Sequence, residues 1–413
     1  MSSIFRALNS RNYRLHFTGQ SISLIGTWMQ RVAVSWLVYR LTNSAYLLGL
    51  VTFLGLIPSL VLAPYIGSFV DRNNRYKIVL FMQIGMMIQA GFMALLVWFQ
   101  WYNIFWIGFL SMTQGVLAAF ETNARQSMMV DLVEKKEDLS NALALNSSAF
   151  NAARLIGPAL AGIVLSTIGE DACFIINFLS FVAVIFCLVT MKINTTPLTK
   201  STENIWVELK NGYSYLRSAP DLSSLILTLA ISSLLVIPFT TLLPVLAKDI
   251  FHGNAVTFSW FESAGGLGAM IGAIYMASLK DHKYLTKITV AASSLLGLGL
   301  IFLAYSPALV FSLICVTLAT MGMMMQTASI NTYIQTHTLP NMRGRAISYY
   351  LMAYQGILPI GSLLTGIMAE KLGTRDVILM EGIAGILLIS CFALYKNYYH
   401  WKRLFIVRIY RHN

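Results

Sequence analysis

Apolar residues along this chain gather into long continuous runs, which short polar stretches separate. A helix needs about 20 apolar residues to cross the hydrocarbon layer of a membrane. The runs reach that length and lack the alternation that is typical of a membrane-spanning strand. The pattern predicts twelve helical spans, at about 16–40, 45–69, 78–99, 104–125, 143–167, 172–191, 221–247, 256–279, 287–304, 308–332, 346–370 and 375–396. We therefore expect an all-α polytopic membrane protein.

The composition excludes the other broad classes of protein. Of the 413 residues 57% are hydrophobic and 11% are charged, whereas about 25% of a soluble domain is charged. A soluble fold of this length would lack a charged surface, so a soluble enzyme is excluded, as are a disordered chain and a secreted disulfide scaffold. The first apolar run is too long for a signal-peptide core, so we expect it to remain as a helix.

The loops carry basic residues on alternate sides of the predicted spans. If the N-terminus lies in the cytoplasm, most of the 29 lysines and arginines fall on the cytoplasmic side, as the positive-inside rule requires. Both termini are then cytoplasmic, in a multi-pass protein of the cytoplasmic (inner) membrane. The net charge of +12 follows from this topology, so we expect no nucleic-acid partner.

A long polar stretch divides the predicted spans into two sets of six. We expect an N-terminal six-helix bundle at 1–191, a cytoplasmic linker with a short amphipathic helix at 192–220, and a C-terminal six-helix bundle at 221–396. A basic cytoplasmic tail at 397–413 is predicted to lie on anionic lipid.

Similar residues recur about half a chain apart, which indicates a duplicated unit. Asp71 and Asp281 are 210 residues apart, Asn123 and Asn331 are 208 apart, and Gly157 of the fifth span and Gly361 of the eleventh are 204 apart. Transporters that are built from such repeats place their substrate path between the halves.

The turn after the second span reads Gly67-Ser-Phe-Val-Asp71-Arg72-Asn-Asn-Arg75. We expect Gly67 to allow close approach to a neighbouring helix, Asp71 to pair with a basic side chain, and the two arginines to anchor the turn at the lipid headgroups. Asp71 and Arg125 would then form a cytoplasmic gate. The alternative is an ordinary turn that only obeys the positive-inside rule.

The fifth span contains Gly157, Pro158 and Gly162. Small residues at near-helical spacing let two membrane helices approach closely, and proline bends a helix. We expect this segment to pack tightly against a neighbouring helix, either as part of the transport machinery or for packing alone.

These motifs, together with Asn12–Gln20, Gly26–Gln30 and Asn123–Gln126, resemble the major facilitator superfamily over essentially the whole chain. The opening segments are similar to the branch of enterobactin-type siderophore exporters and macrolide efflux proteins. The segment with Gly157 resembles the motif of proton-antiport exporters. The resemblance implies two pseudo-symmetric six-helix bundles that export a small molecule by alternating access, energised by protons.

Ionisable side chains inside a membrane are usually paired or functional. Glu262, Glu381 and Glu121 are candidates for proton coupling, in that order. Glu262 can instead form an ion pair at an outer gate, and Glu381 can reach for the outer interface. Glu121 and Arg125 are four residues apart, which favours a structural ion pair along one helix.

Arg154 lies near the middle of its span and is a candidate for binding an anionic or phenolate substrate, because its planar group suits oxygen acceptors. Other polar or aromatic residues in the spans are candidates for lining the path, although some are expected only to link helices. With Arg154, the path candidates are Arg31, Gln30, Trp28, Asn151, Gln114, Gln326, Tyr354 and Gln355.

No nucleotide-binding loop and no catalytic or metal-binding motif is found, so we expect no enzyme, no cofactor and no metal. The sequence predicts a monomeric secondary transporter that exports a siderophore or an amphiphilic drug, with protons and membrane lipids as further partners. The alternatives are an importer of a metal chelate or lipid-like solute, and a membrane sensor that transports nothing.

Overall fold

The computed structural model describes residues 3–192, 205–279, 281, 284–340 and 342–410, and the residues in these ranges form helices and no strands. The chain begins with η1 (Ser3–Asn9). The long helices before the linker are α1 (Arg11–Thr42), α2 (Ala45–Arg72), α3 (Arg75–Trp98), α4 (Ile104–Leu132), α5 (Leu139–Thr167) and α6 (Glu170–Val189), with η2 (Lys136–Asp138) before α5.

The second part of the chain begins with the short helix α7 (Ile205–Ser218). The elements that follow are α8 (Pro220–Leu235), η3 (Ile237–Leu242), α9 (Leu243–Val245), η4 (Leu246–Ile250), α10 (Ala255–Ser278), α11 (Leu285–Ala304), α12 (Leu309–His337), α13 (Arg343–Leu351), η5 (Met352–Gly356), α14 (Leu358–Leu372) and α15 (Thr374–Tyr410).

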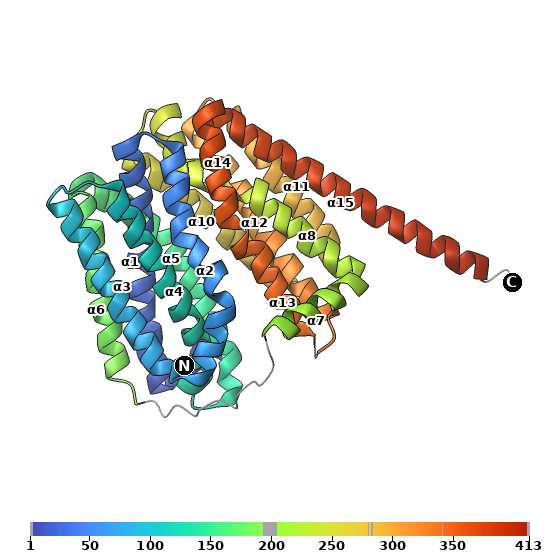
Figure 1. Ribbon diagram of the computed structural model, residues 1–413, viewed down its shortest axis with the longest axis horizontal. Coiled ribbons are helices and arrows are strands. Elements are labelled where there is room, and N and C mark those ends of the chain that lie inside the picture. The colour runs from blue at the N-terminus through green and yellow to red at the C-terminus, as the bar shows by residue number, and fades with distance from the viewer. Residues whose placement is uncertain (1–2, 193–204, 280, 282–283, 341, 411–413) are drawn as a thin grey trace.

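Some of these elements join into longer segments that are apolar enough to cross a membrane. Elements α8 to η4 form one continuous span, Pro220–Ile250, and α13 to α14 form another, Arg343–Leu372. Ten spans in the described part of the chain are long and apolar enough to cross a membrane. Helices α1 and α10, which correspond to the first and eighth predicted spans, lie among these ten (Figure 1). The predicted all-α polytopic fold is confirmed, and each predicted span overlaps an observed one.

The helices pack as two groups, which we call the N-terminal bundle (α1–α6) and the C-terminal bundle (α8–α15). In the first, α1 packs on α5 and α6, while α3 packs on α4 and α6; in the second, α12 packs on α10 and α11. The bundles meet along two seams, where α5 contacts α10 and α2 contacts α14. The two seams are equivalent: α5 occupies in the N-terminal bundle the place that α14 occupies in the C-terminal bundle, and α2 corresponds in the same way to α10. Two pseudo-symmetric bundles require such a pair of seams.

The duplicated unit is visible in glycines 204 residues apart. A Cβ atom on Gly157 would lie 3.2 Å from the Ile25 carbonyl oxygen of α1, and one on Gly361 would lie 2.6 Å from the Leu234 carbonyl oxygen of α8, the equivalent helix. Gly169 and Gly373 share the same offset and follow α5 and α14 with φ of 128° and 95°. Residues that carry a Cβ atom rarely adopt such backbone angles, so glycine suits both turns.

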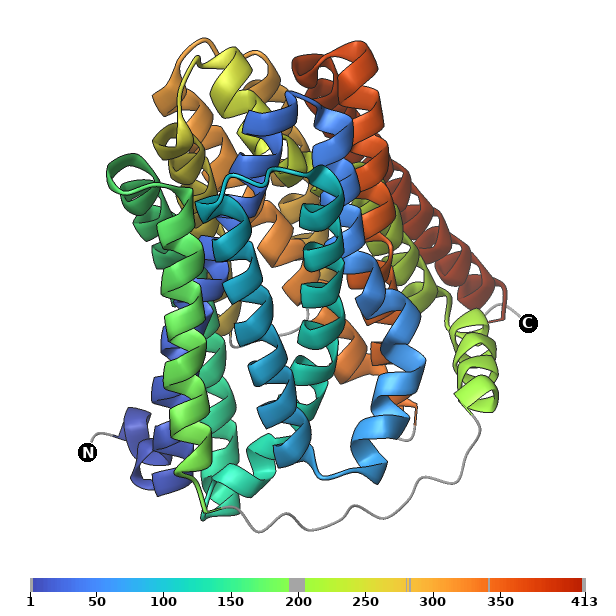
Figure 2. The ribbon, with the colours of Figure 1, turned by 60° about the vertical axis from the view of Figure 1, so that its left-hand side comes forward.

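Among the described residues, the buried apolar cluster that joins the two bundles lies at one end. The cluster that contains Trp36, Leu48, Phe258 and Ala369 draws on both bundles, and we call this the sealed end. At the opposite end, which carries the α2–α3 turn and which we call the basic end, one cluster lies within the N-terminal bundle and another within the C-terminal bundle. Figure 2 shows the two groups of helices running side by side.

The linker and the tail are partly described. Helix α7, in the expected linker, packs on α13, and residues 193–204 lie outside the described part. Helix α15 runs without a break to Tyr410 and projects from the bundle (Figure 1). The predicted tail therefore extends the last span as a helix as far as Tyr410, and 411–413 lie outside the described residues.

Candidate functional site

The central feature of the site is Trp28, which has two arginines over its ring. The Arg31 guanidinium lies 5.1 Å from the ring centroid and the Arg154 guanidinium lies 5.8 Å from it. Phe150 of α5 meets the same ring edge-on at 5.9 Å. Arg31 is exposed, although its neighbours Gln30 and Val32 on α1 are buried. The structure thus brings together three of the residues predicted to line a path.

The C-terminal bundle contributes Glu262 and Tyr354 to this site. Glu262 on α10 lies within electrostatic range of both Arg31 and Arg154, and Tyr354 on η5 lies within range of Arg154. Neither arginine forms an ion pair within 4.0 Å with Glu262. Element η5 is a turn of π-helix, a distortion that is frequent at functional sites. We call Trp28, Arg31, Arg154, Glu262 and Tyr354 the central site.

Glycines hold the backbone of the central site in place. A Cβ on Gly157 would lie 2.5 Å from the Trp28 Cβ, so Trp28 fits against α5 only because this residue is glycine. A Cβ on Gly266 of α10 would lie 2.7 Å from the Arg154 carbonyl oxygen. These two glycines therefore allow α1 and α10 to pack closely against α5 near the arginines.

The fifth span makes close contacts through its two glycines, which face different partners. Gly157 contacts α1 within the N-terminal bundle, whereas a Cβ on Gly162 would lie 2.6 Å from the Ser259 Cβ of the C-terminal bundle. Pro158 is buried between them. Gly162 therefore belongs to the seam between the bundles.

Polar contacts between the bundles close the sealed end. The Tyr39 hydroxyl on α1 donates a hydrogen bond to Asp249 on η4, and Lys248 donates to Asn43 and lies over the Tyr39 ring at 5.5 Å. The Glu370 carboxylate on α14 accepts bonds of 3.2 Å from the Ser44 hydroxyl and from the Tyr46 backbone N–H at the start of α2. We call these contacts the latch.

Glu121 and Arg125 form the structural pair that their spacing predicts. Arg125 Nε lies 2.8 Å from Glu121 Oε1, and both residues are buried. Gln83 on α3 donates to the same oxygen over 3.1 Å. His16 on α1 is buried, lies within electrostatic range of Arg125, and has no hydrogen-bond partner for either ring nitrogen among the described residues. This cluster lies at the basic end, away from the central site.

Three other candidates, two for the path and one for proton coupling, are buried and hydrogen-bonded in this conformation. Gln30 donates to Gln89 over 3.0 Å and accepts from Asn177 over 2.8 Å, which links α1 to α3 and α6. Gln326 accepts from Ser232 over 3.2 Å. Glu381 accepts from Thr365 over 2.7 Å inside the C-terminal bundle. Gln30 and Gln326 therefore link helices in this conformation, which is the alternative role expected for some of the path candidates.

Three further path candidates make no hydrogen bond with the central site among the described residues. Asn151 bonds within its own helix, to the Ser147 carbonyl over 2.9 Å. Gln355 is exposed beside Tyr354. Gln114 is half-buried on α4, and its side-chain oxygen has no hydrogen-bond partner in the described part.

The turn after α2, from Gly67 to Arg75, differs from expectation at two positions. A Cβ on Gly67 would meet nothing within 4 Å among the described atoms, so the predicted close approach is absent here. Arg75 is buried, donates to the Ser127 carbonyl over 2.8 Å and lies 3.6 Å from Asp131, so it anchors α4 and not a headgroup. Arg72 is exposed as expected. The side chain of Asp71 lies outside the described part.

Sequence reasoning missed the second glycine seam and the latch. A Cβ on Gly49 would lie 2.7 Å from the Ser362 carbonyl oxygen, and one on Gly366 would lie 2.6 Å from the Ala45 carbonyl oxygen. Gly366 stands 204 residues after Gly162, the same offset as Gly157 and Gly361, so the internal repeat contained this signal. The latch residues lie in polar turns and carry no comparable signal.

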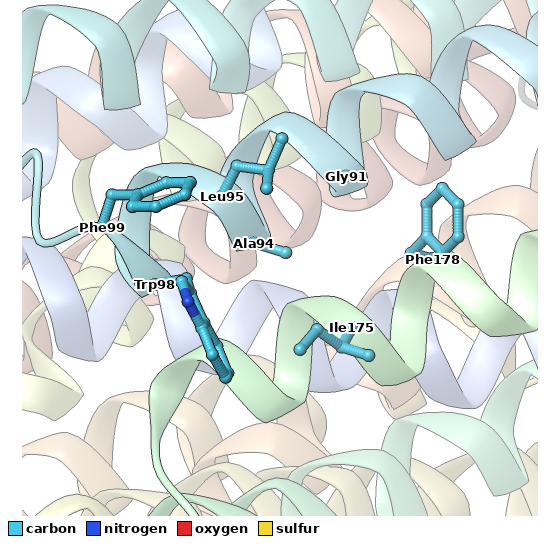
Figure 3. A pocket seen from close by; sticks show the side chains of 7 residues that line it. All are labelled: Gly91, Ala94, Leu95, Trp98, Phe99, Ile175 and Phe178. Carbon is cyan, nitrogen blue, oxygen red and sulfur yellow. The ribbon is translucent and has the colours of Figure 1, made fainter.

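A separate hollow of about 450 Å³ lies between α3 and α6, near the aromatic residues at the end of α3. Figure 3 shows Trp98 of α3 pointing toward α6, which carries Ile175 and Phe178, while Leu95 and Phe99, the residue after α3, lie on the other side of the α3 ribbon. Its lining is apolar apart from the Trp98 indole N–H. None of the central-site residues lines it, and its apolar lining does not suit a charged solute.

The chain matches a family model along almost its entire length. The model describes a transmembrane secretion effector and matches residues 2–401. The chain is 25% identical over 379 residues to the staphyloferrin A transporter of Staphylococcus aureus (strain NCTC 8325 / PS 47), covering 91% of this chain and 94% of that protein. It is 24% identical to macrolide efflux protein A of Streptococcus pyogenes, covering 93% and 95%.

Solved structures show the same fold at lower identity. A bacterial homologue of the iron transporter ferroportin in an inward-facing state superposes with a TM-score of 0.71 at 16% identity, covering 93% of this chain and 98% of that one. A bacterial homologue of the human lysosomal transporter Spinster, inward-facing and occupied, gives 0.72 at 13% identity, covering 94% and 97%. The family and these relatives are transporters, not enzymes. The chain therefore belongs to the transmembrane secretion effector family, within the major facilitator superfamily.

Proposed function

We propose that this protein is a secondary transporter that exports a small organic molecule, a siderophore or an amphiphilic drug, by alternating access. One observation carries the proposal: the latch and a shared apolar cluster join the bundles at the sealed end, while each bundle has its own cluster at the basic end. A site between two bundles that meet at one end is reached from the other. The relatives that transport staphyloferrin A or extrude macrolides support this reading.

The basic end lies in the cytoplasm in this proposal, because the loops there carry most of the arginines and lysines. Both termini are then cytoplasmic, and the protein is a monomer surrounded by membrane lipid. The central site opens toward the cytoplasm, which is the side from which an exporter loads its substrate. The two bundles are the domains that rock against each other.

Protons energise the export, and Glu262 is the carrier in this proposal. It is an intramembrane carboxylate at the centre of the site, and it makes no hydrogen bond with a described residue. Glu381 and Glu121 rank below it, because each accepts hydrogen bonds inside one bundle.

The test is flux of candidate solutes in proteoliposomes under an imposed pH gradient, with Glu262→Gln compared with the matched control Glu381→Gln. We expect Glu262→Gln to abolish the dependence of flux on the pH gradient and Glu381→Gln to keep it. In cells, a deletion strain should accumulate the solute, and an uncoupler should raise its accumulation in the parent strain. Accumulation that ignores the uncoupler contradicts proton coupling, and absence of flux for any solute favours a sensor.

A further inference from the structure

The two arginines of the central site have no carboxylate within ion-pair distance among the described residues, unlike two other arginines of the N-terminal bundle. Arg125 and Arg75 are buried, and each meets a carboxylate, at 2.8 Å and 3.6 Å. Arg31 and Arg154 donate no hydrogen bond to any described residue and form no ion pair there; their described contact is with the ring of Trp28. A guanidinium has five N–H donors, so the N–H groups of both arginines are free to donate hydrogen bonds to a ligand.

The charge of the site is also unbalanced. Two guanidinium groups face one carboxylate, Glu262, so the site keeps a positive charge even when Glu262 is ionised. Contact with an aromatic face contributes only about 0.5–2 kcal/mol per cation, while charged groups inside a membrane span are costly and are normally paired. The missing partner is therefore an anion that comes from outside the chain.

The geometry suits a planar oxygen anion next to an apolar or aromatic body. Guanidinium groups bind carboxylates through two parallel hydrogen bonds, which gives both strength and direction. Arg31 comes from α1 and Arg154 from α5, and both lie over the ring of Trp28, a side chain that packs against Gly157 and Phe150. Pre-positioned donors lose little entropy on binding. Arg31 is exposed, so a ligand can reach it.

We propose that Arg31 and Arg154, held around Trp28, bind the carboxylate groups of an organic anion, and that the exported substrate belongs to this class. This inference rests on the proposed function only in naming the bound anion as the cargo. Cationic amphiphiles are disfavoured, because they would place a third positive charge in the site.

The test is equilibrium binding to the full-length protein in nanodiscs, without any gradient, measured by fluorescence anisotropy. The probes are 5-carboxyfluorescein, a xanthene with carboxylates, and rhodamine 6G, a xanthene cation of similar shape. We expect carboxyfluorescein to bind in a saturable manner and to bind more tightly than rhodamine 6G. Citrate should compete with it, and the neutral trimethyl ester of citrate should not.

The variants are Arg31→Gln, Arg154→Gln and Arg154→Lys, with Arg40→Gln as the matched control. Arg40 lies on the same helix as Arg31 but pairs with Glu170 at 2.7 Å, outside the central site. Each glutamine variant should weaken carboxyfluorescein binding by about tenfold or more, because a charge-assisted pair is lost. Arg154→Lys should retain part of the affinity, and Arg40→Gln should match the wild type. Thermal melting of each variant checks that it is folded.

Three results would overturn the inference: no saturable carboxyfluorescein binding to the wild type, tighter binding of rhodamine 6G, or Arg31→Gln and Arg154→Gln variants that bind carboxyfluorescein as Arg40→Gln does. Flux measurements separate this inference from the proposed function. Selective anion binding without flux contradicts export alone, whereas export of another solute without anion binding contradicts the anionic substrate alone.

Discussion

The sealed end and the basic end of this protein are stabilised by contacts of different kinds. At the sealed end the latch, from Tyr39 to Asp249 and from Glu370 to the start of α2, crosses between the bundles. At the basic end the polar contacts described above, such as Arg125 with Glu121 along α4 and Arg75 with Asp131 between α3 and α4, stay within one bundle.

This difference follows from what a transport cycle demands. Contacts between bundles have to break and re-form in each cycle, so the polar contacts among them are individual hydrogen bonds and not buried ion pairs. Contacts inside a bundle persist through the cycle and can be strong buried ion pairs. A substitution at the basic end should therefore change the stability of the fold, and one at the sealed end should change the balance between conformations.

The largest effect is expected for Arg125→Ala at the basic end. It leaves the Glu121 carboxylate buried without its cation, and breaking a buried pair in this way typically costs about 3–5 kcal/mol. Thermal unfolding in detergent should show a clear loss of stability. Arg72→Ala, the loss of an exposed arginine at the same end, is the control and should unfold like the wild type. Equal melting of the two variants would break the comparison.

A smaller effect is expected for Gly162→Leu at the sealed end. A Cβ there would lie 2.6 Å from the Ser259 Cβ, and overpacking of this kind costs about 1–3 kcal/mol. The penalty applies only while α5 and α10 are in contact, so the sealed end should open more often. Pulsed EPR between spin labels at Tyr46 and Leu372, in a background without native cysteines, should show longer distances.

Gly67→Leu is the matched control for this variant, because a Cβ there would meet nothing within 4 Å. It should leave the distance between the labels as in the wild type. If both leucine variants lengthen this distance, the seam at Gly162 does not govern the sealed end.

The smallest effect is expected for Tyr39→Phe in the latch. The variant removes one hydrogen bond to Asp249, worth about 1 kcal/mol. The population with an open sealed end should rise about fivefold in the same EPR measurement, without a change in melting temperature. Tyr305→Phe, at an exposed position, should have no effect. A drop in melting temperature for Tyr39→Phe alone would place the latch among the stabilising contacts of the fold.

The spans were predictable from sequence because the hydrocarbon layer imposes length and apolarity on each of them. The ends of helices were less predictable. Helix α4 continues to Leu132 and α12 to His337, beyond the apolar runs, because a helix can leave the membrane without ending. The π-helical turns η4 and η5 depend on tertiary packing and have no signal in hydropathy.

The charged residues of the site could be predicted from the sequence, but the partners of its polar side chains could not. Arg31, Arg154 and Glu262 stand out because a charge in an apolar run is conspicuous. Gln30 carries the same kind of signal, yet it bonds to Gln89 and Asn177. Which polar side chains meet depends on how each helix is rotated about its axis, and a single sequence does not fix that rotation.

The two arginines beside Trp28 bear on the free energy of export. A cargo that neutralises them is negatively charged, and the interior of a bacterial cell is electrically negative with respect to the outside. Expelling one such charge releases about 2.3 kcal/mol for every 100 mV across the membrane. The voltage would then assist expulsion directly, and a cargo bearing several carboxylates would draw proportionally more work from the same field.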